Sequence, residues 1–246
     1  MMNQRATFHG TPVLEPGQTW RWPRQAERRL VLSVSIGDDL INRWTEPARA
    51  KYAERVGASC LTLRDYLPVG DSPHWEKLRI ADYLRQGYRV LWVDSDVLIE
   101  DGAPDIFGYV APEEFGAVDE VRTAQWAEHH PGLEERVVEL AWTTGFPMED
   151  RPDQYWNTGV MVASPCHEDV FNLAGDDPVS DCVFEQTWLN LSIARQYVRM
   201  CSLPRYFNNM QNFRENRPSH GQFLHAAGRA AAAKVRDLLE VAEAAD

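Results

Sequence analysis

The sequence predicts a single α/β domain with a mixed, mainly parallel central sheet flanked by helices. Three observations support this fold class. The chain has 246 residues, of which 44% are hydrophobic, and this is enough for one sizeable core. From residue 29 to residue 93, β-rich segments alternate with helix-like segments, which favours parallel strands. No internal repeat or low-complexity linker divides the chain. We therefore expect an irregular, proline-punctuated arm at residues 1–28 and one domain at residues 29–246.

The expected elements follow one another along the chain. Apolar, β-rich runs predict strands at 29–36, 58–63, 89–93, 115–119, 157–164 and 198–203. Helical spacing predicts a helix that begins at Thr45-Glu46-Pro47 and ends at Gly57. It predicts further helices at 75–87, 167–175, 181–196 and 229–245. Residues 120–153 read as an irregular, aromatic-bearing insertion, where we expect acceptor specificity to lie.

Composition excludes several classes of function. A formal net charge of −12 argues against a general nucleic-acid binder, which needs clustered Lys and Arg. No apolar run approaches the ~20 residues of a membrane span, and the N-terminus lacks the apolar core of a secretory signal. The four cysteines form no C-x-x-C pair, which fits reduced thiols. We expect a cytoplasmic protein with neither a nucleic-acid partner nor a transmembrane segment.

A pair of carboxylates follows the apolar run 89–93, in the sequence Asp94-Ser95-Asp96. In open α/β sheets, ligands bind beyond the carboxyl ends of the strands, where this pair falls. Two carboxylates so close repel each other, so we expect a divalent cation, a lysine or a shared proton between them. D-x-D alone is a weak signal, and two aspartates that cap a turn would give the same pattern.

The stretch DSDV also matches the D-x-D-x-[TV] pattern of haloacid dehalogenase-like phosphatases, in which the first Asp is a nucleophile. That chemistry normally requires a lysine further along the chain, and no lysine occurs between Lys77 and Lys234. The acidic strand is also not the first strand of the domain. The other interpretation is a cation site for a nucleotide diphosphate, because Mg²⁺ and Mn²⁺ are held by one or two carboxylates together with substrate phosphates.

Several further motifs favour the second interpretation. In chain order they are Ile36-Gly37-Asp38-Asp39, VLWVDSDVLI, FGAVDE, YWNTGVMVAS, FEQTWLN and FLHAAG. In this order they resemble the motifs of the GT-A glycosyltransferases, especially glycosyltransferase family 8 and its glycogenin-like relatives, over residues 29–228. The resemblance implies a GT-A-like (Rossmann-like) domain. It also implies transfer of a sugar from a nucleotide-sugar donor, which we expect to be a UDP-sugar, with retention of anomeric configuration.

The resemblance also implies roles for individual residues. Asp94, Asp96 and His225 would bind Mn²⁺, or Mg²⁺, together with the donor diphosphate. Lys77 stands where the family usually has an Arg that contacts the donor, and Glu185 and Gln186 would lie near the anomeric carbon in catalytic or orienting roles. The remaining predicted donor contacts are Ile36, Gly37, Asp38, Ser95, Asp119, Asn157 and Gly228, with Gly159 permitting close approach.

Departures from the family pattern keep other classes of protein open. In FEQTWLN, Glu185 and Thr187 depart from the family's D-Q-D-x-L-N, and a non-catalytic nucleotide-sugar-binding module therefore remains an alternative to the enzyme. Arg229 followed by alanines replaces the usual Lys-Pro-Trp, which leaves diphosphate contacts from that segment open. A nucleotidyltransferase is disfavoured because SIGDDL has too few glycines for a phosphate loop. The sequence does not identify the acceptor, which could be a glycan, a lipid, a protein or a small molecule.

Overall fold

The computed structural model describes residues 27–36, 39–65, 73–120, 154–172, 185–210 and 222–226. The predicted C-terminal helix and the predicted insertion from residue 121 onward lie outside these residues. So do Gly37, Asp38 and Gly228 of the predicted donor site, and most of the predicted N-terminal arm.

The described strands form a six-stranded mixed sheet in the order β2-β1-β3-β6-β5-β7. Its members are β1 (Arg28–Val34), β2 (Ser59–Leu63), β3 (Tyr88–Val93), β5 (Phe115–Asp119), β6 (Trp156–Ala163) and β7 (Met200–Ser202). Strand β1 is parallel to β2 and β3, and β7 is parallel to β5, whereas β6 runs antiparallel to both of its neighbours. A separate antiparallel pair joins β4 (Val97–Ile99) to β8 (Phe223–His225). The predicted fold class, mixed and mainly parallel, is confirmed.

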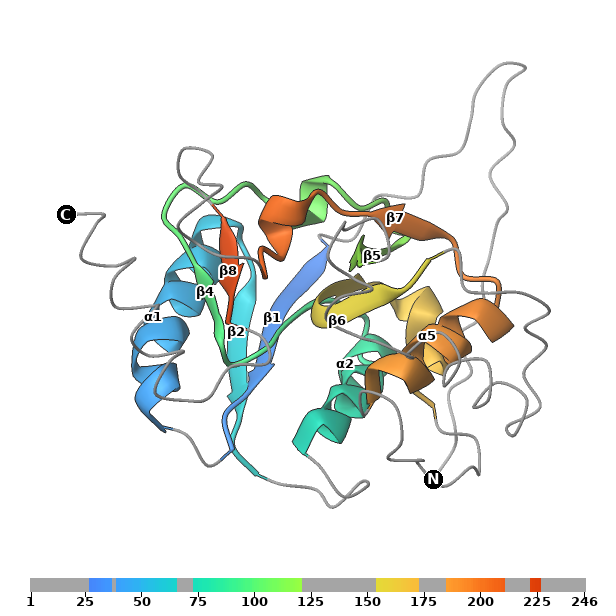
Figure 1. Ribbon diagram of the computed structural model, residues 1–246, viewed down its shortest axis with the longest axis horizontal. Helices are drawn as coiled ribbons and strands as arrows, with labels where there is room; N and C mark the ends of the chain where they lie inside the picture. The colour runs from blue at the N-terminus through green and yellow to red at the C-terminus, as the bar shows by residue number, and fades with distance from the viewer. Residues whose placement is uncertain are drawn as a thin grey trace, which may run out of the picture.

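Helices cover both faces of the sheet. The α-helices are α1 (Asp39–Arg55), α2 (Ile80–Arg85) and α5 (Glu185–Arg195), and the 3₁₀ helices are η1 (Pro73–Arg79), η2 (Ile106–Gly108), η3 (Pro165–Phe171) and η4 (Arg205–Phe207). In Figure 1, α1 lies next to β2 and the β4–β8 pair, while α2 and α5 lie together near β6.

Side-chain alternation along the strands separates two cores. On β3, Trp92 packs with residues of α2, η3 and α5, and Leu91 packs with residues of α1, β4 and η2. Successive strand residues point to opposite faces, so a strand that is apolar at every position requires cover on both sides. Because both faces are covered, the carboxyl end of β3 is the part of this strand available for polar chemistry.

Helix α1 begins earlier than predicted. It starts at Asp39 and contains Pro47 in its interior, whereas the sequence suggested a start at Thr45. The prediction was wrong because the buried face of this helix carries polar residues. Thr45 and Arg49 are both fully buried, so the first turns lack the apolar period that usually marks a helix.

Two predicted helices are partly or wholly 3₁₀. The predicted helix 75–87 consists of η1 followed by the short α2, and the predicted helix at 167–175 is η3 where the structure describes it. Apolar spacing does not distinguish an i,i+3 helix from an i,i+4 helix over so few turns. Of the helices in the described part of the chain, none is long and apolar enough to span a membrane.

Candidate metal and donor site

Asp94 lies immediately after the last residue of β3, and two hydrogen bonds hold it there. Its backbone N–H donates to the carbonyl of Gly159 on β6 at 2.8 Å. The indole Nε1 of buried Trp92 donates to Asp94 Oδ1 at 2.7 Å. An apolar strand residue thus fixes the orientation of the carboxylate that follows it.

The turn from Asp94 to Asp96 is braced from two sides. Helix α1 contributes the hydroxyl of Thr45 and the guanidinium of Arg49, which donate to the carbonyl of Ser95 at 2.7 and 3.4 Å. From the other side, the N–H of Ala226 donates to the carbonyl of Asp96 at 3.1 Å. These contacts explain why α1 carries buried polar residues: they serve the turn rather than the apolar core.

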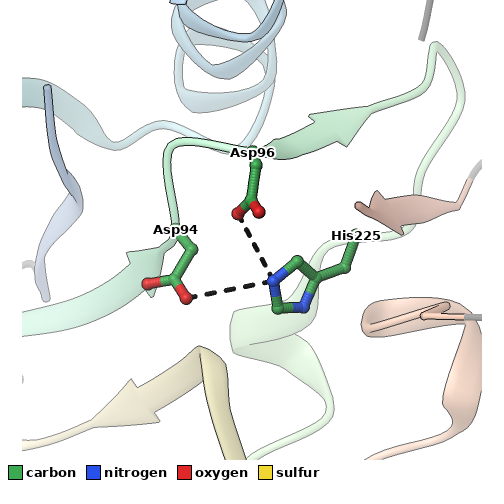
Figure 2. A group of neighbouring side chains, drawn as sticks. All are labelled: Asp94, Asp96 and His225. Carbon is green, nitrogen blue, oxygen red and sulfur yellow. Dashed lines mark ion pairs between the residues drawn. The ribbon is translucent and has the colours of Figure 1, made fainter. Parts of the chain in front are cut away.

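Strand β8 brings His225 to the acidic pair. The β4–β8 register places His225 opposite Val97, one residue after Asp96. Its Nε2 lies 3.3 Å from Asp96 Oδ1 and 3.9 Å from Asp94 Oδ2 (Figure 2). One ligand atom from each of the three residues lies within 4.8 Å of the others. The structure thus brings together the three residues that the sequence proposed as metal ligands.

The electrostatics of this cluster favour positive charge. Burial, the largest single influence, works to lower the pKa of His225, but the neighbouring Asp96 and Asp94 outweigh it and raise the pKa above its ordinary value. The imidazole and Asp96 are buried, while Asp94 is half-buried. Excess negative charge at a partly open position is what a cation site requires.

The donor set also suits a divalent cation. Carboxylate oxygens are the preferred ligands of Mg²⁺ and Mn²⁺, and Mn²⁺ also accepts imidazole. Octahedral bonds of ~2.1 Å place neighbouring ligand atoms about 3 Å apart. The two separations from His225 Nε2 to the carboxylates, 3.3 and 3.9 Å, require only small side-chain adjustments to reach that value.

Lys77 is buried next to this cluster. Its Nζ lies 3.2 Å from the carboxylate of Asp94, 3.2 Å from Thr158 Oγ1 and 2.5 Å from Glu185 Oε1. Burial works to lower the pKa of Lys77, but these two carboxylates outweigh it and raise the pKa. An ammonium group has three hydrogens, and these three acceptors occupy all of them. Lys77 therefore links Asp94 in the acidic turn to Glu185, the first residue of α5.

The two residues with predicted catalytic roles, Glu185 and Gln186, open α5 and are both buried. Oε1 of Glu185 accepts hydrogen bonds from Lys77 and from the hydroxyl of Thr158. Oε1 of Gln186 accepts from the N–H of Thr158 at 3.1 Å, and its Nε2 donates to Glu120 Oε2 at 3.1 Å. Both side chains are held by β6 and its neighbours rather than projecting freely.

The predicted donor residues lie near this network where they are described. Asn157, on β6, accepts from the N–H of Gly159 and donates to Glu120 Oε1 at 2.6 Å. Asp119, at the end of β5, accepts from the N–H of Tyr155 at 3.3 Å. Ile36 is half-buried after β1, and Ser95 is half-buried within the acidic turn. Their proposed contacts to a donor stay predictions.

Sequence reasoning missed several residues of the site. Glu120, Asn208, Trp92 and Thr45 all contact predicted site residues, but the sequence assigned none of them a role in the site. Glu120 directly follows Asp119 in FGAVDE, so a second carboxylate at a strand end was the available signal. Trp92 lies two residues before Asp94 in VLWVDSDVLI, where its apolar neighbours indicate only a strand residue. Asn208 and Thr45 carry no such signal, and only the fold brings them to the site.

Comparison with known proteins supports the fold. No protein-family model matches the chain, and no curated protein sequence matches it. Among solved structures, a glycosyltransferase involved in the glycosylation of the major capsid of PBCV-1 matches with a TM-score of 0.56 at 14% identity, over 87% of this chain and 99% of that one. The bifunctional glycosyltransferase WbbM, solved in its apo form, matches with a TM-score of 0.54 at 12% identity, over 89% of this chain and 50% of that one.

The fold is that of a GT-A glycosyltransferase. The resemblance drawn from the motifs is confirmed at this level. The PBCV-1 enzyme is covered almost completely, so the shared fold extends over its whole chain, whereas in WbbM this chain spans about half the length. Galactosyltransferase LgtC, solved with donor and acceptor sugar analogues, also matches, with a TM-score of 0.44 at 13% identity over 86% of this chain and 95% of that one.

Proposed function

We propose that this protein is a metal-dependent glycosyltransferase that transfers a sugar from a UDP-sugar to an acceptor, with retention of anomeric configuration. The observation that carries the proposal is the convergence of Asp94, Asp96 and His225 beyond the carboxyl end of β3. This is the position at which open α/β sheets bind ligands. The fold is shared with solved glycosyltransferases.

Mn²⁺ is the proposed cation. Asp94 and Asp96 would supply oxygen ligands and His225 a nitrogen ligand, a mixed set that suits Mn²⁺ better than Mg²⁺. When bound, the cation would act as a Lewis acid that stabilises the charge on the departing nucleoside diphosphate. The protein contributes by holding the Asp94 side chain through the Trp92 indole and the Asp96 backbone through the N–H of Ala226.

The proposed donor site extends from the acidic turn along the neighbouring strand ends. Ile36, Gly37 and Asp38 would contact the nucleoside, while Ser95 and Gly228 would lie along the donor. Asp119, Asn157 and Lys77 would face the sugar. The contacts of Lys77 support an additional role, because its charge lies between two carboxylates that would otherwise repel each other.

Glu185 and Gln186 are proposed to orient the sugar or act near its anomeric carbon. Both atoms of the Gln186 amide are engaged by Thr158 and Glu120, which supports an orienting role for Gln186. In Glu185, Oε1 is engaged by Lys77, while Oε2 lies 4.0 Å from His74 Nδ1. These contacts fix both side chains at the start of α5, so small changes there should affect turnover more than donor binding.

The alternatives have less support. A phosphatase of the haloacid dehalogenase type is not favoured by the fold, which matches glycosyltransferases. A lysine does lie beside Asp94, but it is Lys77, and it is shared with Glu185 rather than reserved for a phosphoryl group. A non-catalytic binding module would retain the same metal cluster. Turnover is therefore the property that distinguishes a module from an enzyme.

The test is hydrolysis of a panel of UDP-sugars with and without Mn²⁺, in the parent protein and in Asp96→Ala. We expect Mn²⁺-dependent release of UDP from at least one sugar, and its loss in the variant. UDP binding should weaken in the variant as well. No turnover with any sugar, together with UDP binding that Asp96→Ala leaves unchanged, would falsify the proposal. Mn²⁺-dependent UDP binding without turnover would point to a binding module.

A further inference from the structure

A row of buried amide side chains lies behind His225. Its Nδ1, the ring nitrogen that does not face the carboxylates, lies 2.8 Å from Asn208 Oδ1. The Nδ2 of Asn208 donates to Asn157 Oδ1 at 2.6 Å. All three side chains are buried, so water does not compete for these hydrogen bonds. The orientation of each group is therefore dictated by the next one.

The backbone of β6 sets the direction of the whole row. The N–H of Gly159 can only donate, and it donates to Asn157 Oδ1 at 2.8 Å. That atom must then be the amide oxygen, and Asn157 Nδ2 is left to donate to Glu120 Oε1. Since Asn157 presents an oxygen to Asn208, Asn208 must present its NH₂ group there, and its own oxygen faces His225.

A second backbone amide leads to the same result by another route. The N–H of Thr158 donates to Gln186 Oε1, so Gln186 Nε2 is left to donate to Glu120 Oε2. Two amide groups thus donate to the two oxygens of Glu120, which accepts both as a carboxylate. Gly159 and Glu120 therefore fix the orientation of the Asn157 amide together: the N–H of Gly159 requires an oxygen on one side, and the carboxylate of Glu120 requires the NH₂ group on the other.

The orientation of Asn208 determines which nitrogen of the His225 imidazole carries a hydrogen. Because Asn208 offers His225 an oxygen, which only accepts, Nδ1 of His225 must carry the hydrogen. In the metal-free protein Nε2 can donate a hydrogen to Asp96. Once Nε2 loses that hydrogen, the neutral imidazole keeps its single N–H on Nδ1, and the lone pair of Nε2 is available to a cation between Asp94 and Asp96. We propose that Asn208 is a positioning residue that holds His225 in the tautomer required for metal binding. The inference rests on the proposed metal site for its purpose, but the hydrogen bond itself can be tested without metal.

The experiment compares three variants with the parent. Asn208→Ala removes the acceptor that faces His225. Asn208→Asp keeps an acceptor oxygen there in nearly the same shape, but it loses the NH₂ group that donates to Asn157 Oδ1. Asn209→Ala is the matched control, because this neighbouring asparagine donates its amide to Gln222 at 2.7 Å and takes no part in the row. Thermal unfolding establishes that each variant folds.

Two readouts are required. In the metal-free protein, ¹H–¹⁵N spectra of the imidazoles report whether a slowly exchanging Nδ1–H is present on His225. Titration with Mn²⁺ alone, followed by electron paramagnetic resonance, reports affinity. We expect the Nδ1–H signal in both Asn208→Asp and Asn209→Ala, and parent-like affinity in Asn209→Ala. In Asn208→Ala we expect loss of the signal and a ~10–100-fold weaker affinity, the usual cost of losing the hydrogen-bond partner of a metal-bound histidine.

The outcomes separate this inference from the proposed function. An Asn208→Ala protein that keeps the Nδ1–H signal and binds Mn²⁺ as tightly as the parent would overturn the inference. So would an Asn208→Asp protein that folds but lacks the Nδ1–H signal. A parent that shows the Asn208-dependent signal but does not bind Mn²⁺ would support the hydrogen-bond assignment and overturn the proposed metal site.

Discussion

Gly159→Ala should remove the metal site by displacing His225. A Cβ atom at Gly159 would lie 2.2 Å from Cε1 and 2.7 Å from Nδ1 of the imidazole. The shorter distance falls about 1 Å below the range of ordinary carbon contacts. Asn208 supports the ring from its Nδ1 side, and Asn157 Oδ1 is itself 3.0 Å from the added carbon. The ring must therefore leave its position or β6 must shift.

The magnitude follows from the tolerance of metal coordination. Ligand distances in metal sites hold to within about 0.2 Å, so a displacement of about 1 Å removes His225 from coordination. Losing the hydrogen-bond partner of a metal-bound histidine weakens metal affinity by ~10–100-fold, and losing the histidine itself should cost at least as much. We therefore expect Mn²⁺ affinity to fall by at least ~100-fold. Overpacking should also lower the free energy of unfolding by about 1–3 kcal/mol. The sequence suggested that Gly159 admits the donor, but in the structure the group that approaches it is the His225 ring.

The assay is Mn²⁺ titration together with denaturant unfolding, and Gly116→Ala is the matched control. A Cβ at Gly116 would lie 2.5 Å from Val110 Cγ2, so this variant crowds another strand without touching the acidic turn. Gly116→Ala should be destabilised but should keep Mn²⁺ affinity. The double variant Gly159→Ala/His225→Ala should recover stability without recovering binding. Parent-like Mn²⁺ affinity in Gly159→Ala would refute the reasoning.

Three further predictions concern the surroundings of the site. Lys77→Met leaves the carboxylates of Asp94 and Glu185 without their cation, so the free energy of unfolding in urea should fall by about 3–5 kcal/mol. Adding Glu185→Gln should recover much of this loss. Equal losses in the single and double variants would contradict the ion-pair account. Thr45→Val leaves the carbonyl of Ser95 with only the 3.4 Å contact from Arg49, so the free energy of unfolding should fall by about 1–2 kcal/mol. Thr45→Ser keeps the hydroxyl and should lose less than half of that. Equal losses in the two variants would show that the hydroxyl is unimportant. In the metal-free protein the carboxylates outweigh burial and raise the pKa of His225. The protonated form of His225 therefore stabilises the fold. This stabilisation is fully present below about pH 6.5, the unfolded-state pKa, and is lost as the pH rises through the folded-state pKa. The melting temperature of the parent relative to His225→Gln should therefore fall as the pH rises from 6 to about 9, while Mn²⁺ binding should tighten because the metal replaces a proton; a pH-independent difference would contradict the shift.

The sequence was informative where chemistry and local pattern coincide. Asp94 and Asp96 follow an apolar strand, and a ligand site beyond the carboxyl end of that strand follows from sheet geometry alone. His225 was found because FLHAAG resembles a family motif, and not from any local property of histidine. The fold explains its position, since β8 pairs with β4 directly after the acidic turn.

Other parts of the site could not be predicted because their partners are distant in the sequence. Asn208 is an ordinary asparagine until β8 and β6 place His225 and Asn157 on either side of it. Thr45 and Arg49 concealed the start of α1 because they face the carbonyl of Ser95, fifty and forty-six residues further along the chain. Buried polar residues that serve a site interrupt the apolar periodicity on which helix prediction depends.

The central claim is that Asp94, Asp96 and His225 hold one divalent cation for a nucleotide-sugar diphosphate. The most direct test is a crystal soaked with Mn²⁺ and UDP, with data collected for the anomalous signal of manganese. The account predicts one manganese peak within bonding distance of both carboxylates and of His225 Nε2, with the diphosphate completing its coordination. A bound UDP with manganese elsewhere, or with the three side chains left uncoordinated, would contradict it.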